Sequence, residues 1–128
     1  MKQIHLLSLF TFLLTNSFYT WGQDGNPLRV WPSAAPDEPS GIKSQKAKPV
    51  TGSDGVIRIP YVESPELFHF PVSHDKATGT CIIVCPGGGY GKVAWNKEGT
   101  EIATWLNTLG VEAVVLKYRV PRRDREKP

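Results

Sequence analysis

The chain has 128 residues and a formal net charge of +3, a length that suits one small domain rather than two. The charge gathers in Lys117–Pro128, which holds six basic and two acidic residues. A basic segment of this kind can bind nucleic acid, but no aromatic residue is interleaved among its arginines after Tyr118. Composition therefore favours a solvated charged tail and argues against a nucleic-acid partner.

Residues 1–22 have the pattern of a secretory signal peptide. Lys2 precedes the apolar stretch Ile4–Leu14, and Thr20 and Gly22 place small residues three and one before a cleavage site. The apolar core is shorter than the ~20 residues of a membrane span. We therefore expect cleavage, no stable membrane span afterwards, and a secreted or periplasmic protein.

The part after residue 22 divides into an arm and a domain. Residues 23–55 hold five prolines and four glycines, a density at which no apolar period survives, so we expect an extended arm. Residues 56–128 begin with two alternating segments, Val56–Val62 and Leu67–Val72. Because Pro60 and Pro71 lack a backbone N–H donor, both segments are predicted to be edge-type strands.

Residues 80–118 predict a strand, a helix and a second strand. Thr80–Cys85 is continuously apolar and β-branched, which indicates a strand buried on both faces. The apolar stripe within Asn96–Leu109 predicts a helix with Gly110 as its C-terminal cap, and Val111–Tyr118 is again apolar. This order predicts a parallel pair of strands. One helix covers only one face of a parallel sheet, so we expect part of a larger α/β domain.

The two cysteines, Cys81 and Cys85, fall within the first of these strands. Four residues apart on one strand, their Cα atoms would be ~13 Å apart, at ~3.3 Å per residue. A disulfide needs less than ~7 Å. Both are therefore predicted to be small buried hydrophobes rather than a disulfide.

Three consecutive glycines, Gly87, Gly88 and Gly89, follow the first apolar strand. A phosphate cradle of the Gly-x-x-x-x-Gly-Lys-Ser/Thr type is rejected because Val93 replaces the metal-binding hydroxyl. The dinucleotide fingerprint Gly-x-Gly-x-x-Gly/Ala matches residues 89–94 literally, but the helix begins too late for its N-terminus to face a pyrophosphate.

An oxyanion hole fits the same loop better. Acyl transfer places negative charge on the former carbonyl oxygen, and fixed backbone N–H groups stabilise it. Glycines let a substrate approach the backbone and adopt conformations that other residues avoid. Three glycines after a proline exceed what a tight turn requires.

The segment Cys85–Tyr90 resembles the glycine loop that follows the third strand of α/β-hydrolases. Together with Glu98-Gly99 and the run Leu116–Pro121, it is similar to an exported bacterial esterase branch related to acetyl xylan esterases. Pro86 departs from the histidine of many relatives. The resemblance implies Gly88 and Gly89 as oxyanion donors, Gly87 and Tyr90 at the substrate, and no cofactor. For Tyr90, a ring packed over the helix is an equal alternative; Trp95 and Asn96 are weaker candidates for the mouth of the site.

The chain contains no catalytic triad in the order that the resemblance implies. No Gly-x-Ser-x-Gly elbow is present, and His69 and His74 precede the glycine loop. His69, His74 and Asp75 also lack convincing metal-ligand spacing. The expectation is the amino-terminal part of an exported serine esterase acting on acetylated carbohydrate, inactive by itself. The alternative is a non-catalytic fragment or a carbohydrate-contacting module.

Overall fold

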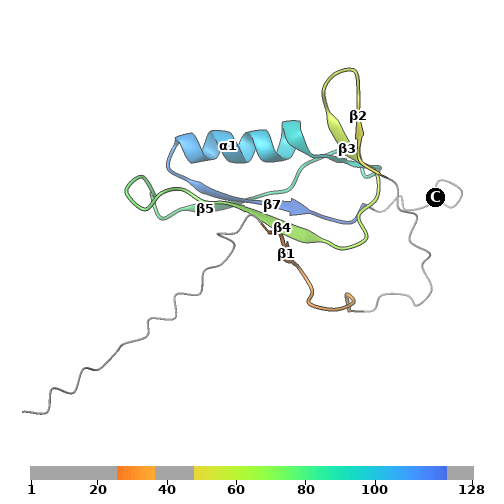
Figure 1. Cartoon of the computed structure of the whole chain (residues 1–128), viewed down its shortest axis with the longest axis horizontal. Coiled ribbons are helices and arrows are strands. Elements are labelled where there is room, and N and C mark those ends of the chain that lie inside the picture. Colours follow the sequence, from red (N-terminus) through yellow and green to blue (C-terminus); the bar gives the residue numbers. More distant parts are fainter. Residues whose placement is uncertain (1–25, 37–47, 121–128) are drawn as a thin grey trace, which may run out of the picture.

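The computed structural model describes residues 26–36 and 48–120, which form two small β-sheets and one helical segment (Figure 1). The predicted signal peptide and the basic residues after Val120 lie outside this range. The larger sheet has four strands, in the order β1 (Leu28–Arg29), β4 (Glu66–Phe70), β7 (Glu112–Lys117) and β5 (Cys81–Val84). The described part of the chain is therefore mixed α/β.

A smaller antiparallel sheet lies beside the larger one. Its strands are β2 (Val50–Thr51), β3 (Ile57–Ile59) and β6 (Val93–Ala94), with β3 in the middle. Ile59 of β3 and Val93 of β6 are buried together with Val62 and Val120, and these four residues form a separate hydrophobic cluster. Part of the predicted extended arm thus pairs locally, β1 with β4 and β2 with β3.

The predicted strand–helix–strand unit is confirmed. β5 and β7 are parallel, with Val84 beside Val115. The helix begins at Asn96, as predicted, with a π-helical turn over Asn96–Thr100, and continues as α1 (Glu101–Thr108). Gly110 then adopts a φ of +75°, which suits the predicted glycine cap.

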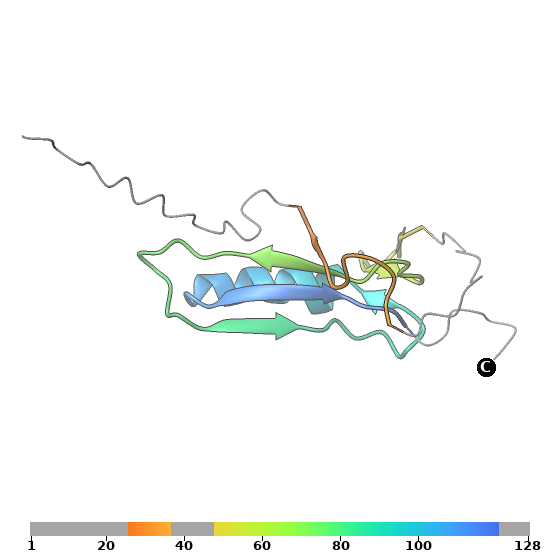
Figure 2. The ribbon, with the colours of Figure 1, turned by 90° about the horizontal axis from the view of Figure 1, so that it is seen from below.

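The main core lies between α1 and one face of the larger sheet. Figure 1 shows α1 along β5, β7 and β4. Ala103 and Leu106 of the helix pack with Val84, Ala113 and Val115 of the sheet, and all five are buried. Seen from below, the other face of these strands carries no helix among residues 26–36 and 48–120 (Figure 2).

The prediction that Thr80–Cys85 is buried on both faces is wrong for the described chain. β5 is an edge strand of the sheet, so β7 is its one neighbour and α1 covers one of its faces. Ile82 is 41% and Ile83 63% exposed, and only Val84 of the strand is buried. Cys81 and Cys85 are free, as predicted, but exposed rather than buried.

The predicted edge positions of the two earlier strands are also wrong. β4 lies between β1 and β7, and β3 lies between β2 and β6. The strands end at Phe70 and Ile59, one residue before Pro71 and Pro60. Each proline therefore falls just outside the paired segment, where its missing donor does not interrupt a ladder.

The apolar stripe of the helix is buried only in part. Ile102, Trp105 and Leu109 are 40%, 56% and 53% exposed.

None of the helices in the described ranges has the length and apolar character needed to cross a membrane.

Candidate functional site

The glycine loop lies at the carboxyl end of β5, and two close contacts fix its first residue, Pro86, to the rest of the protein. The hydroxyl of Tyr118, just after β7, donates a 2.5 Å hydrogen bond to the carbonyl oxygen of Pro86. Pro86 is buried, and Gly99 of the helix packs so closely that an added Cβ would lie 2.8 Å from its ring and 3.1 Å from Val115. The start of the loop is thus fixed to both the helix and the sheet.

Most backbone polar groups at the start of the loop have partners within the protein. The N–H of Gly87 donates to Oε2 of Glu98 at 3.0 Å, and the carbonyl oxygen of Gly87 accepts from Ala94 N at 2.8 Å. The carbonyl oxygen of Gly88 accepts from Gly91 N at 3.4 Å. By contrast, the N–H groups of Gly88 and Gly89 have no hydrogen-bond partner among residues 26–36 and 48–120.

Three successive residues of the loop have positive φ. The angles are +148° at Gly88, +61° at Gly89 and +59° at Tyr90, the one non-glycine residue with positive φ in the described ranges. A side chain at Gly88 would overlap the carbonyl oxygen of Lys92, whereas a Cβ at Gly89 would meet nothing within 4 Å. Glycine is therefore required at Gly88 by packing as well as by conformation.

Tyr90 is 75% exposed as a residue, which contradicts the alternative in which its ring packs over the helix. A left-handed conformation costs a non-glycine residue of order ~1–3 kcal/mol and tends to occur at functional sites. Tyr90 directly follows Gly88 and Gly89 in the sequence, and its side chain is exposed to solvent.

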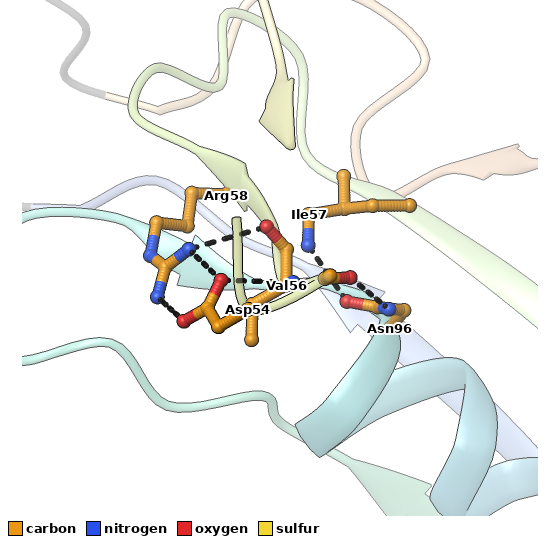
Figure 3. Close-up of polar contacts among 6 residues, drawn as sticks. Asp54, Val56, Ile57, Arg58 and Asn96 are labelled. Carbon is orange, nitrogen blue, oxygen red and sulfur yellow. Dashed lines mark hydrogen bonds and ion pairs between the residues drawn. The ribbon is translucent and has the colours of Figure 1, made fainter. Parts of the chain in front are cut away.

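Asn96, one of the two weaker candidates for the mouth, links the helix to the smaller sheet (Figure 3). The backbone N–H of Trp95, the other candidate, donates to the carbonyl oxygen of Ile57 at 2.8 Å. Asn96 Oδ1 accepts from Ile57 N at 2.8 Å, and its Nδ2 donates to the carbonyl oxygen of Gly55 at 3.0 Å. The Trp95 ring meets Phe68 edge-on, with centroids 4.7 Å apart. Their contacts give both residues a structural role.

Figure 3 also shows the exposed pair formed by Asp54 and Arg58, whose nearest atoms are 2.5 Å apart. The Arg58 guanidinium holds the pKa of the Asp54 carboxyl well below its usual range. The same aspartate accepts from Val56 N at 3.1 Å. This pair shapes the turn that leads into β3.

The residues weighed for metal binding do not form a cluster. Nε2 of His69 lies 3.4 Å from Oε2 of Glu112, as a cross-strand contact between β4 and β7. Within the described ranges, no group of three His, Cys, Asp or Glu side chains is placed to hold a metal ion.

A hollow of about 330 Å³ lies away from the glycine loop and has walls of mixed charge. Its lining includes Arg29, Glu63, Glu66 and Lys117. Lys117 forms an ion pair with Glu66 across β7 and β4. None of the residues that line this hollow belongs to the glycine loop.

Sequence reasoning did not assign roles to Glu98 and Tyr118, the two side chains that bind the loop backbone. Glu98 lies eleven residues from its partner and Tyr118 thirty-two, so neither contact has a local spacing signal. Glu98 entered only as part of the family resemblance, and Tyr118 only as the end of the second predicted strand. Their contacts became evident once the helix and β7 were placed against the loop.

Comparison with known proteins gives one partial relative. The chain is 37% identical over 54 residues to an acetylxylan esterase of Xylanibacter ruminicola. That stretch is 42% of this chain and 11% of the esterase, so the chain spans a small part of its relative's length. No protein-family model matches the chain, and no solved structure matches it at a significant level. The similarity suggests a relation to esterases and goes no further.

Proposed function

We propose that this chain is the amino-terminal part of a serine esterase of the α/β-hydrolase type, and that its glycine loop forms half of the oxyanion hole. The observation that carries the proposal is the hydrogen-bond pattern of the loop. The N–H of Gly87 and the carbonyl oxygens of Pro86, Gly87 and Gly88 are paired, while the N–H groups of Gly88 and Gly89 have no partner in the described ranges. The partial esterase relative supports the same reaction class.

In the proposed reaction a serine attacks the carbonyl carbon of an ester, and a histidine accepts its proton. Negative charge then develops on the carbonyl oxygen. The N–H groups of Gly88 and Gly89 donate to this oxygen, together with a donor beside the serine. Each such donor can contribute ~3 kcal/mol of transition-state stabilisation, because a preorganised dipole does not have to turn during the reaction.

The remaining parts of the loop serve the substrate in this proposal. Gly87 borders the substrate at the start of the loop, and the side chain of the exposed Tyr90 lines the acyl or alcohol pocket. A small ester is the substrate, and by resemblance to the acetylxylan esterase it is an acetyl group on a carbohydrate. The reaction as proposed uses no cofactor.

The proposal extends to the organisation of the chain. Residues 1–22 are a signal peptide that directs the protein to the periplasm or outside the cell. Residues 23–55 are an arm, and residues 56–128 belong to the hydrolase domain. The open edge of β5 and the sheet face opposite α1 fit this assignment, since parallel strands are normally covered on both faces.

The test is made on the protein purified from the cells that produce it. We expect an intact mass above that of residues 23–128, hydrolysis of p-nitrophenyl acetate and of acetylated xylan, and labelling of a serine by a fluorophosphonate. A mass equal to residues 23–128 with neither hydrolysis nor labelling contradicts the proposal. That result would favour a non-catalytic product.

A further inference from the structure

Glu98 reaches from the first turn of the helix to the backbone of the glycine loop. Its Oε2 accepts the N–H of Gly87 at 3.0 Å. A Cβ on Gly87 would lie 2.5 Å from the same oxygen, so the carboxylate sits directly against the glycine. Glu98 makes no ion pair in the described ranges, whereas Lys97, its neighbour, pairs with Glu101 at 3.0 Å.

This contact occupies one of the backbone donors of the three glycines. Three consecutive glycines offer three N–H groups, and the Glu98 carboxylate occupies the first. Of the three glycines, Gly88 and Gly89 have N–H groups with no partner in the described ranges. The Glu98 carboxylate would also repel the negative charge that the proposed oxyanion hole binds at the next two residues. A glutamate at this position is therefore better explained by its hydrogen bond to the loop than by its charge.

The other anchors of the loop come from different elements. Tyr118 holds the carbonyl oxygen of Pro86 from the end of β7, and Ala94 of β6 holds that of Gly87. Both anchors bind carbonyl oxygens, whereas Glu98 binds an N–H group. Pairing of the Gly87 N–H therefore depends on the Glu98 side chain.

We infer that Glu98 is a positioning residue of the oxyanion loop, which fixes the loop through Gly87 and leaves Gly88 and Gly89 as the reactive donors. The inference rests on the proposed function for its catalytic consequence. The hydrogen bond needs an acceptor oxygen and not a charge. Glu98→Gln keeps the acceptor and removes the charge, while Glu98→Ala removes both.

Kinetics of acetyl-ester hydrolysis by the whole protein separate the two variants. Glu98→Ala lowers kcat roughly tenfold with little change in KM, since a misplaced loop costs transition-state contacts more than substrate binding. Glu98→Gln keeps kcat at or above the wild-type value. Glu101→Ala is the matched control on the same helical segment, and its kcat stays unchanged. A fall in Glu98→Gln as large as that in Glu98→Ala overturns the positioning role.

Amide hydrogen exchange gives a readout that does not depend on activity. The Gly87 amide is protected in the wild type, in Glu98→Gln and in Glu101→Ala, and exchanges faster in Glu98→Ala. Unchanged protection in Glu98→Ala overturns the inference. If the wild type shows no hydrolysis, the proposed esterase function fails, and the exchange data still decide whether Glu98 holds the loop.

Discussion

Replacement of Gly88 by alanine tests how tightly the glycine loop is determined by its surroundings. The φ of +148° is rarely open to a residue with a side chain. An added Cβ would lie 2.8 Å from the carbonyl carbon of Lys92 and overlap its oxygen. Because these are main-chain atoms, rotation of a side chain cannot relieve the clash.

The expected loss of stability has two parts. Backbone strain of this kind costs ~1–3 kcal/mol, and forcing an extra methyl group into a closed space typically costs a further ~1–3 kcal/mol. The loop is partly exposed and can relax, so we expect Gly88→Ala to lower the free energy of unfolding by about 3 kcal/mol. Gly79→Ala is the matched control, since Gly79 has a φ of +80° and nothing within 4 Å of its Cβ position. That variant loses only ~1–2 kcal/mol.

Urea unfolding followed by tryptophan fluorescence measures both variants under the same conditions. The two substitutions share the cost of a positive φ and differ in the space around the new methyl group. Equal unfolding free energies for Gly88→Ala and Gly79→Ala would refute the reasoning, because the contact with Lys92 would then carry no energetic weight.

Substitutions at three further positions test the contacts of the helix, the loop and the open sheet edge. Asn96→Ala leaves the N–H of Ile57 unpaired and should lower the unfolding free energy by ~1–3 kcal/mol, while Asn96→Asp retains the acceptor and loses less; equal losses in urea unfolding would count against this. Burial raises the pKa of the Tyr118 hydroxyl above its ordinary value of about 10. The neutral hydroxyl is thereby favoured in the folded state, so its contribution is present below pH ~10 and lost as the pH rises through the raised pKa. Tyr118→Phe should remove that pH dependence, together with the hydrogen bond to Pro86, and an unchanged alkaline profile would contradict it. Finally, residues 26–120 produced alone should bind a hydrophobic dye, and Ile83→Lys at the exposed edge should reduce the signal; absence of dye binding would contradict the open edge of β5.

The central unit of the fold was predictable because its signals are local. Two continuous apolar runs, a helical stripe between them and Gly110 at its end were enough to predict a parallel β-α-β unit. The position of the glycine loop followed from the same pattern. Each of these signals depends on residues within a few positions of one another.

The surroundings of the strands were harder to predict. The continuous apolar run of β5 predicts a strand in the interior of a sheet. In the described chain, however, β5 has a neighbouring strand on one edge only. Pro60 and Pro71 suggested edge strands, yet each lies one residue past the paired segment. Strand boundaries decide whether a proline matters, and boundaries are what sequence patterns specify least well.

The support of the site depends on contacts between distant segments. Asn96 and Ile57 are separated by 39 residues, and Tyr118 and Pro86 by 32. No periodicity links such pairs, since they meet only after the helix and sheets have packed. The sequence therefore pointed to the loop, while the residues that hold it emerged from the structure.

The most direct test of the proposed oxyanion site is the rate of acetyl-ester hydrolysis by Gly89→Ala beside Gly79→Ala in the whole protein. Both positions have positive φ and open space around an added Cβ, so their stability losses should match. In the proposed site, a methyl group on Gly89 would crowd the oxyanion that its N–H binds, and we expect kcat/KM to fall by on the order of tenfold or more. Gly79→Ala should hydrolyse at the wild-type rate. Equal rates for the two variants would contradict a role for Gly89 in the oxyanion hole.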